Sequence, residues 1–420
     1  MKLHPMLSSL GHHKLTVALL VLQVAFTCAI VCNATFLIAQ RVQRISVVSG
    51  VDEDALSVVT VSDLQAGDNP LGVHQADLAA LRRLPGVESA SMVSNVPLSG
   101  DQNSFGGCGS LEAVHAAMAA RSTEVPGCAS PDDYEVGTEA LRTLGLKLVA
   151  GRDFDAGDYV PGTSGDDLPA VPAIIITRDL ARRLYGDGPA VGRSMYLGRR
   201  GLQGEGVRVV GVVEHLLRGS LVRGAGNDQS LLAPVEPGHA SVRFVLRSKP
   251  ADRARVIEAA RAMLATRVAG RTVPDRDSQP YTRIRAEYFQ RDITMIGLLL
   301  ASALGLLFVT ALGIAGLANF WVQQRTRTIG IRRAIGATRG DILRYFQTEN
   351  FLIVSGGIAF GLLLAVALNL WLMERYELSR LPLFYLPIGA LAMWLLGQLA
   401  VLSPALRAAA VPPVVATRSV

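Results

Sequence analysis

The sequence predicts a membrane protein with four transmembrane α-helices, one before and three after a large extracytoplasmic α+β domain. Three observations support this fold class. Four long apolar runs, Leu15–Ala39, Ile293–Phe320, Phe351–Met373 and roughly Phe384–Leu402, contain no charged residue. The first two runs are separated by residues 40–290, which are far more polar and carry both strand and helix patterns. The short loop between the second and third runs, residues 322–350, holds six arginines.

The apolar runs have the length of membrane-spanning helices. Each is close to the ~20 residues that a helix needs to cross ~30 Å of hydrocarbon. We therefore expect transmembrane helices at residues 15–39, 291–321, 351–373 and 384–403. The fourth is the least typical, because it carries Pro387 and Gln398. The first could instead be a signal peptide, but it is long for that role and no small-x-small cleavage site follows it, so we expect a retained anchor.

Basic residues beside the spans predict the orientation of the chain. The loop at 322–350 carries Arg325, Arg327, Arg332, Arg333, Arg339 and Arg344, against only Asp341 and Glu349. Short arginine-rich loops lie on the cytoplasmic side of a membrane. The basic residues at the two ends of the chain agree with this assignment: His12, His13, Lys14, Arg407 and Arg418. We therefore expect cytoplasmic termini at 1–14 and 404–420, an external domain at 40–290 and a short external loop at 374–383.

The long polar segment has the alternating strand and helix patterns of an α+β or α/β domain with two subdomains. The expected strands are Ala55–Val61, Val87–Val93, Val171–Thr177, Val207–Val213 and Ser241–Arg247. The expected helices are His74–Leu84, Tyr134–Leu144, Arg178–Tyr185 and Ala251–Thr266. A further helical pattern, Tyr281–Arg291, runs into the second span without a glycine or proline, so we expect one continuous helix there.

The four cysteines fall into two pairs. Cys28 and Cys32 lie in the first span at helical i,i+4 spacing, where they are interpreted as small apolar side chains. Cys108 and Cys128 lie in the external domain, where an oxidising compartment would allow a disulfide. We predict that bridge, although the sequence does not show whether the two Cα atoms lie within bonding distance.

The sequence lacks the motifs of the common catalytic and nucleotide-binding sites. No H-E-x-x-H, G-x-S-x-G or C-x-x-C motif occurs. The four lysines are followed by Leu3, Leu15, Leu148 and Pro250, so none is the lysine of a Walker A motif. The apolar runs carry no ionisable residue for an ion-coupled carrier. We therefore expect a non-catalytic chain with no metal or cofactor, whose energy comes from another subunit. Membrane topology explains the formal charge of +6, so no nucleic-acid partner is expected.

The arginine-rich loop carries the most specific motif in the chain. Residues Arg325–Glu349 read RTRTIGIRRAIGATRGDILRYFQTE, which resembles the segment after the second transmembrane helix of MacB/FtsX-type ABC transporter permeases. The segment Ser403–Pro413 resembles the closing segment of that family. Four external stretches resemble its periplasmic core domain: Tyr134–Phe154, Ile174–Tyr185, Gly192-Arg193 and Val209–Val213. The resemblance covers nearly the whole chain but departs at Gly100–Pro131, and no ATPase domain is fused.

The resemblance implies a permease dimer, of two copies or of paralogues, on two ABC ATPase subunits in the bacterial inner membrane. The sequence leaves open whether a periplasmic adaptor is a further partner, and ATP would be used by the ATPase alone. The resemblance implies that the loop at 322–350 docks on the ATPase through Arg325, Ile329, Gly330, Ile331, Arg332, Arg333, Ile335, Gly336, Arg339, Asp341 and Glu349. One apolar face is expected to contain Ile329, Ile331, Ala334, Ile335 and Ile342. The alternative is a helix that lies on anionic lipid.

Two glycines in the third span, Gly357 and Gly361, have the small-x-x-x-small spacing of closely packed helices. They are candidates for an ordinary helix contact or for the dimer contact itself. At the level of function, the first hypothesis is a permease that converts ATP-driven closure into movement of the external domain and so exports a substrate. The alternatives are an FtsX-like regulator of a cell-wall hydrolase and a membrane sensor without an ATPase.

Overall fold

The structure is a computed structural model that describes residues 14–62, 69–162, 170–198, 206–222, 224, 226–238, 241–268, 271–376 and 380–410. The chain divides into two compact units. The helical unit comprises Met1–Ser46 and Arg291–Val420, and the α/β unit comprises Val47–Gln290. The expected terminal basic residues His12, His13 and Arg418 lie outside the described residues.

The helical unit is built from long apolar helices. They are α2 (Lys14–Ile45), α9 (Gln290–Gln324), α11 (Arg339–Tyr376) and α12 (Tyr385–Ala410), with the short α10 (Thr326–Ala334) between α9 and α11. All four long helices have the length and composition to cross a membrane, as the sequence predicts. They extend past the predicted limits because charged residues such as Arg41 and Arg44 continue the helical pattern. The chain is therefore a multi-pass membrane protein.

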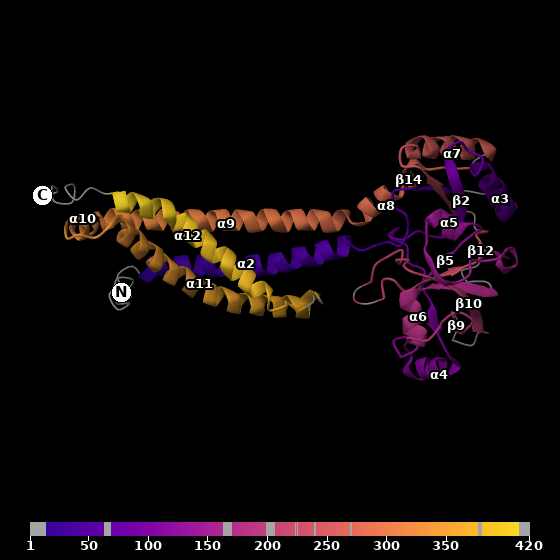
Figure 1. Ribbon diagram of the computed structural model, residues 1–420, viewed down its shortest axis with the longest axis horizontal. Helices are drawn as coiled ribbons and strands as arrows, with labels where there is room; N and C mark the ends of the chain where they lie inside the picture. Colours follow the sequence, from indigo (N-terminus) through magenta and orange to yellow (C-terminus); the bar gives the residue numbers. More distant parts are fainter. Residues whose placement is uncertain are drawn as a thin grey trace. The chain divides into compact units, whose positions relative to one another are not determined.

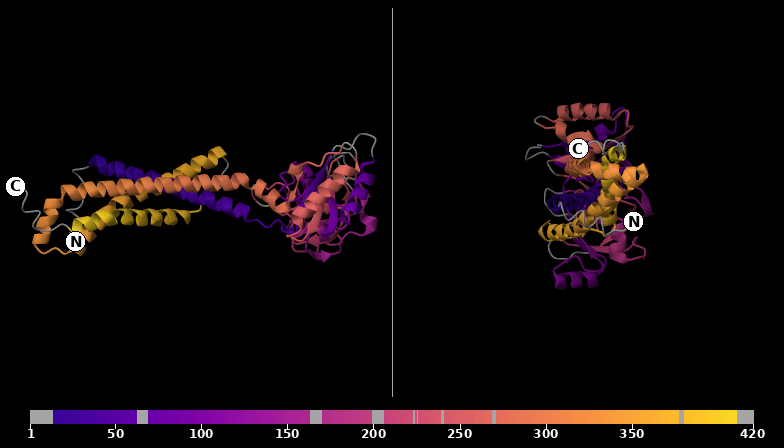
Figure 2. Two further views of the ribbon diagram at one scale, coloured as in Figure 1. Left: turned by 90° about the horizontal axis from the view of Figure 1, so that it is seen from above. Right: turned by 90° about the vertical axis from the view of Figure 1, so that its left-hand side faces the viewer.

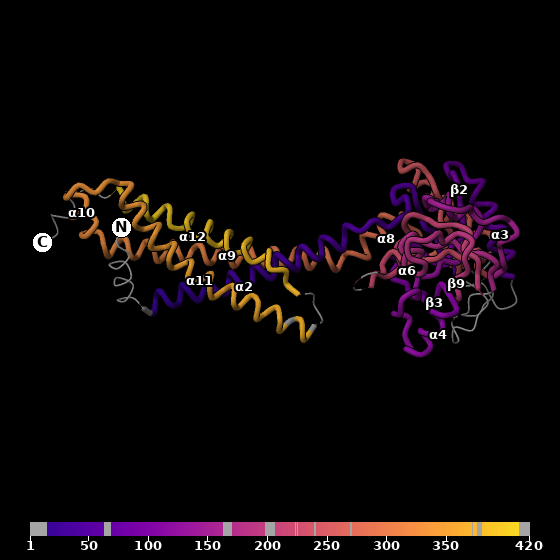
Figure 3. Tube along the Cα trace, turned by 60° about the horizontal axis from the view of Figure 1, so that its bottom comes forward, coloured from indigo at the N-terminus to yellow at the C-terminus, as the bar shows by residue number. Residues whose placement is uncertain are grey.

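Three of these helices pack together and the fourth is less covered. Helices α2, α11 and α12 contact one another in pairs, and Figure 3 shows α11 and α12 running along α2. Helix α9 runs the length of the unit in Figures 1 and 2. It meets α2 along a narrow seam that includes a 2.8 Å hydrogen bond between the hydroxyls of Thr27 and Thr310. Much of its apolar surface remains exposed, including Leu298, Phe308 and Leu312.

The α/β unit contains a four-stranded antiparallel sheet in the order β14-β1-β13-β2. Its strands are β1 (Leu56–Val61), β2 (Val87–Val93), β13 (Val242–Ser248) and β14 (Ser278–Pro280). Helices α3 (Pro70–Leu81) and α7 (Arg253–Arg267) lie with this sheet in one half of the unit (Figure 1). Buried Phe244, Leu81 and Leu264 belong to the core that joins the sheet to both helices. Helix α8 (Tyr281–Tyr288) follows β14 directly.

The second sheet has eight strands, with the path β4-β3-β9-β10-β8-β11-β5 and β6 beside β10. Its strands are β3 (Gly106–Cys108), β4 (Cys128–Ala129), β5 (Asp132–Glu135), β6 (Leu148–Gly151), β8 (Ala173–Thr177), β9 (Ser194–Gly198), β10 (Gly206–Val213) and β11 (Ser230–Ala233). Helices α4 (Leu111–Ala120) and α6 (Arg178–Tyr185) lie in this half, whereas α5 (Ala140–Leu144) contacts β2 and β13 of the first sheet. Strands β7 (Val160–Pro161) and β12 (Val235–Glu236) form a separate pair.

The two sheets share one hydrophobic core, so the α/β unit is a single packed body. Val58 and Val245 of the first sheet, Ile175 and Leu232 of the second, and Tyr281 of α8 all belong to it. A contiguous apolar core resists bending between the sheets, since separating them would expose that surface to water.

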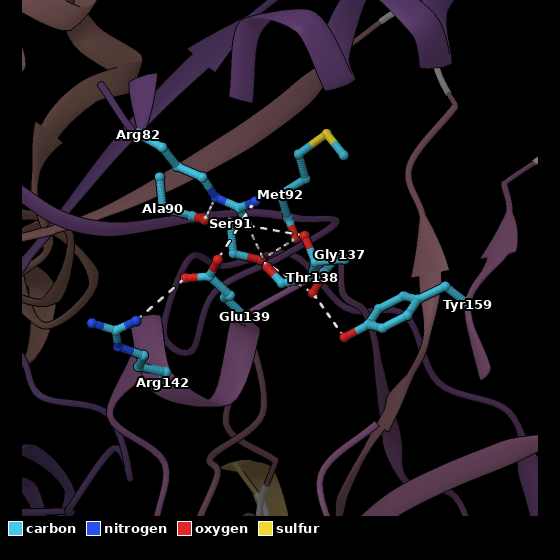
Figure 4. Close-up of polar contacts among 9 residues, drawn as sticks. All are labelled: Arg82, Ala90, Ser91, Met92, Gly137, Thr138, Glu139, Arg142 and Tyr159. Atoms are coloured by element: carbon cyan, nitrogen blue, oxygen red, sulfur yellow. Dashed lines mark hydrogen bonds and ion pairs between the residues drawn. The ribbon is translucent and has the colours of Figure 1, made fainter. Parts of the chain in front are cut away.

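Arg82 links the edge of β2 to the segment that follows β5 through hydrogen bonds (Figure 4). Its Nε donates to the carbonyl of Ala90 at 3.0 Å, where a further strand would otherwise pair. Its Nη2 donates to the carbonyl and the hydroxyl of Thr138, at 3.0 and 2.9 Å. The amide of Gly137 donates to the carbonyl of Met92 at 2.9 Å. A planar guanidinium with several donors can bond the Ala90 and Thr138 oxygens at once and so protects the strand edge.

Two sequence expectations for the α/β unit are wrong. The expected helix Tyr134–Leu144 is a strand, β5, followed by a turn and the short α5, because Tyr134 is buried beside β11 and Glu139 adopts a left-handed φ of 64°. The expected continuous helix Tyr281–Arg291 is interrupted at Phe289, which has φ −90° and ψ 3°. Phe289 is buried, and its amide still donates to the carbonyl of Arg285, so the interruption is one residue long.

Candidate functional site

The segment Arg325–Glu349 folds as α10, a turn and the first turns of α11. In Figure 1, α10 lies at the end of the helical unit at which α2 begins and α12 ends. The expected single apolar face is divided between the core and the surface. Ile329, Gly330 and Ile342 are buried, and both isoleucines belong to the core of the helical unit. Ile331 and Ile335 are 46% and 82% exposed.

An ion pair fixes the start of α10 to α11. The Arg325 guanidinium lies 2.9 and 3.1 Å from the two carboxylate oxygens of Glu349, whose side chain is 2% exposed. The next residue, Asn350, donates to the carbonyl of Gly397 in α12 at 2.9 Å. Removing one partner of a buried ion pair typically costs 3–5 kcal/mol. Arg325 and Glu349 therefore hold the segment in place and do not offer a free surface.

Gly336 and Asp341 shape the turn between α10 and α11. Gly336 has a φ of 106°, a conformation that side-chain-bearing residues rarely adopt. The amides of Gly336 and Ala337 donate to the carbonyls of Arg333 and Arg332, which is the Schellman ending of a helix. Asp341 and Thr338 then cap α11 reciprocally, with a hydroxyl-to-carboxylate distance of 2.6 Å. Thr338 is not among the residues predicted from the sequence, although the T-x-x-D spacing signals such a cap.

Four of the five remaining predicted residues are exposed, whereas Arg333 is half-buried. We call Ile331, Arg332, Ile335 and Arg339 the α10 surface. Arg332 also lies over the Tyr345 ring, 4.9 Å from its centroid, which holds its guanidinium against α11. The α10 surface therefore presents two exposed apolar side chains close to two exposed arginines.

The two glycines of the third span pack within the chain. A Cβ on Gly357 would lie 2.7 Å from Cβ of Val24, and one on Gly361 would lie 2.7 Å from Cβ of Cys28. Both neighbours belong to α2. Because α2 occupies this face, the glycines cannot form the contact between two copies that the sequence left open.

We predict that Gly361→Ala destabilises the helical unit by about 1–3 kcal/mol, the usual cost of overpacking. Gly356→Ala is the matched control, since a Cβ there meets no described atom within 4 Å. Thermal unfolding of the two variants in the same detergent measures the difference. Equal midpoints would show that α2 and α11 do not pack as the structure places them.

The two external cysteines lie opposite each other on β3 and β4. The structure joins Cys108 to Cys128, which are 20 positions apart in sequence and have Cα atoms 4.1 Å apart. Both are buried against Val114 and Ala117 of α4. Arg183 of α6 donates to the Cys128 carbonyl at 2.9 Å. The segment Gly100–Pro131, which departs from the family pattern, is therefore cross-linked by this disulfide.

We predict that Cys108→Ser with Cys128→Ser lowers the stability of the α/β unit by about 3 kcal/mol, the loop-closure value for ~20 residues. Mass spectrometry of non-reduced peptides, from protein made in an oxidising compartment, should find the two residues linked. Cys28 and Cys32, which are free in the structure, provide the internal control for alkylation after unfolding. Two alkylated external cysteines in that material would contradict the bridge.

The comparisons with known proteins agree with this architecture. The family model described as the MacB-like periplasmic core domain matches residues 15–263, and the one described as the FtsX-like permease C-terminal matches residues 300–413. The chain belongs to the MacB/FtsX-type ABC transporter permease family. Residues 264–299, which include α8 and the start of α9, lie between the two matches. The second match includes all of Arg325–Glu349.

Named relatives in this family are transporters. The chain is 28% identical over 399 residues to "Macrolide export ATP-binding/permease protein MacB 1/2" of Paracoccus denitrificans, which covers 92% of this chain and 53% of that protein. It is 29% identical over 294 residues to MacB of Chromobacterium violaceum, covering 66% of this chain and 42% of that protein. The chain thus spans about half the length of the curated relatives it matches.

Solved structures give a weaker likeness. The periplasmic region of MacB from Actinobacillus actinomycetemcomitans matches at 12% identity with a TM-score of 0.32, covering 58% of this chain and 97% of that one. The extracellular domain of the transporter YknZ matches at 15% identity with a TM-score of 0.31, covering 52% of this chain and all of that one. Scores of this size do not establish a shared fold.

Proposed function

We propose that this chain is the permease subunit of an ABC transporter. It would couple ATP hydrolysis by a separate ATPase subunit to movement of the α/β unit on the outer side of the membrane. The observation that carries the proposal is the α10 surface. Ile331 and Ile335 are exposed although the helix that bears them is anchored, by Arg325 and Glu349, to a helix that continues into the membrane. A force applied to this surface therefore acts on α11.

We propose the one-plus-three topology with both termini in the cytoplasm of a bacterial inner membrane. The arginine-rich α10 segment would lie inside by the positive-inside rule. Helix α2 begins, and α12 ends, at the same end of the helical unit as α10, which supports this assignment (Figure 1). The α/β unit, inserted between α2 and α9, would then be periplasmic. The periplasm is oxidising, so the disulfide between Cys108 and Cys128 would be stable there.

The proposed transport acts on the periplasmic side and does not pass substrate between the helices of one chain. Several polar side chains buried among the described helices bond to neighbouring backbone or side-chain atoms. Asn33, for example, donates to the carbonyls of Ala29 and Ala365, at 3.0 and 3.1 Å. Such groups hold helices together and do not line a polar path. We propose export of a substrate by motion of the α/β unit. Macrolide export is named for the relatives and is not proposed for this chain.

The proposed assembly contains two permeases, two ATPases and a periplasmic adaptor. In this chain, α9 leaves apolar side chains exposed along its length, such as Met295, Leu304 and Phe320. A second permease could cover this helix, which is the least buried of the four long helices, whereas α2, α11 and α12 bury part of their surface against one another. The match to the MacB-like periplasmic core domain, residues 15–263, favours transport over the regulation of a hydrolase.

Hydrogen exchange tests the proposal on the purified permease–ATPase complex. ATP with vanadate should change amide exchange in α10 and also in the α/β unit, whereas ADP should leave both as they are without nucleotide. A change confined to α10 would contradict coupling to the α/β unit. A complex in which nucleotide changes neither segment would contradict the permease assignment itself.

A further inference from the structure

The α/β unit is joined to the rest of the chain by two segments that lie side by side. One is Val47–Glu53, which follows α2, and the other is α8, which precedes α9. If both segments were loose, movement of either helix would be absorbed by the connection. In the structure, each segment instead makes hydrogen bonds to the rest of the α/β unit, and the two segments also bond to each other.

The segment Val47–Glu53 is held by close backbone contacts. Gly50 has a φ of 90°, and a Cβ there would lie 2.3 Å from the carbonyl oxygen of His215, so only glycine fits. Ser49 is buried, and its carbonyl accepts from the amide of Leu217 at 3.0 Å. The Ser49 hydroxyl donates to the Glu53 carboxylate at 2.6 Å.

Helix α8 is held by its aromatic residues. The Tyr281 hydroxyl donates to the carbonyl of Pro97 at 2.9 Å from within the shared core. Burial raises the pKa of this hydroxyl, so it remains a donor at physiological pH. At the other end of the helix, the Tyr288 hydroxyl accepts from the amide of Leu221 at 2.7 Å. Phe289, which follows α8, is buried.

Arg285 connects the two segments. Its Nη1 lies 2.6 Å from a carboxylate oxygen of Glu53, and its Nη2 donates to the carbonyl of Val47 at 2.8 Å. The same guanidinium lies over the Phe289 ring, 5.4 Å from its centroid. One side chain on α8 therefore contacts both ends of the segment after α2 and the residue before α9. A planar fork makes these contacts together, which a lysine ammonium cannot do in the same geometry.

We infer that Arg285 is a positioning residue that makes the two connections move as one. Displacement of α9 would be passed to α8 and, through Arg285, to Val47–Glu53, so that the α/β unit is pulled at two points rather than one. Two anchored points define a direction of movement, whereas a single point would let the unit swivel. This inference rests on the proposed function, since it describes how the proposed movement reaches the α/β unit.

Hydrogen exchange of the full permease–ATPase complex tests the role of Arg285. Without nucleotide, amides in Val47–Glu53 should exchange about tenfold faster in Arg285→Gln, the scale of one lost charge-assisted hydrogen bond. Arg285→Lys should show a similar increase because it keeps the charge but not the fork. The control is Arg283→Gln on the same helix, which removes only an exposed pair with Glu287 and should match the wild type.

The decisive comparison adds ATP and vanadate. In the wild-type complex, exchange in Val47–Glu53 and in α8 should change together; in Arg285→Gln, only α8 should respond. A joint response that survives Arg285→Gln would overturn the inference while leaving the proposed function intact. No response in the wild type would instead contradict the proposed function. If Arg285→Gln and Arg283→Gln differ in thermal midpoint but not in this response, Arg285 is structural only.

Discussion

Aspartate at both Ile331 and Ile335 is expected to abolish retention of the ATPase by this chain. Both side chains are exposed in the isolated chain, so the charges lie in water and the fold should tolerate them. In the complex each charge would enter an apolar pocket, at a cost of roughly 2–3 kcal/mol. Two such costs weaken binding by about a thousandfold or more. Affinity purification of the tagged permease, followed by quantification of the ATPase, measures the loss.

The structure offers two comparisons that make this result specific. Leu111→Asp with Met118→Asp places two charges on exposed apolar positions of α4, and ATPase retention should stay at the wild-type level. Ile329→Asp places a charge in the core of the helical unit, so it should reduce the amount of folded permease itself. Normal ATPase retention by the Ile331 and Ile335 double variant would remove the α10 surface from the docking interface.

Insertion of three glycines between Phe289 and Gln290 is expected to abolish export while ATP hydrolysis by the partner continues. The insertion point lies after α8 and before α9, so both helices can form as they do now. Three glycines form a flexible linker that absorbs displacement, whereas the present connection is one buried residue. Export assayed in cells should therefore be lost, whereas ATP hydrolysis by the purified complex should stay at the wild-type rate.

The matched control is the same insertion between Asp187 and Gly188, in the exposed turn after α6. That turn links α6 to β9 within the α/β unit and does not connect the two units. Export should persist in this variant. Wild-type export rates after insertion at Phe289 would mean that the α/β unit is a passive binding module and that the helical connection transmits nothing.

The sequence predicts the membrane helices well because their signal is composition over a long window. A charge-free run such as 351–373 has few alternatives to a spanning helix. Strands with continuous apolar runs, such as β8 and β10, are found for the same reason. Short strands such as β3 and β4 are missed, because two or three residues carry no period and pair only through tertiary contacts.

In the segment Arg325–Glu349, the sequence does not predict which residues are buried and which are exposed. The motif picks out residues Arg325–Glu349 but assigns them all to one surface. Burial divides them: Ile329 packs inward, Glu349 pairs with Arg325, Gly336 makes the turn, and Ile331 and Ile335 remain outside. A helix period cannot reveal this division, because α10 is short and its neighbours, α9 and α11, decide which of its faces is covered.

Co-purification of this chain from its native membrane tests the central claim most directly. The tagged chain, expressed at its native level and extracted in mild detergent, would be captured and its bound subunits identified by mass spectrometry. We predict an ABC ATPase in stoichiometric amount, together with a second permease copy or a paralogue, and loss of the ATPase alone in the Ile331 and Ile335 double variant. Recovery of intact permease with no nucleotide-binding subunit would contradict it.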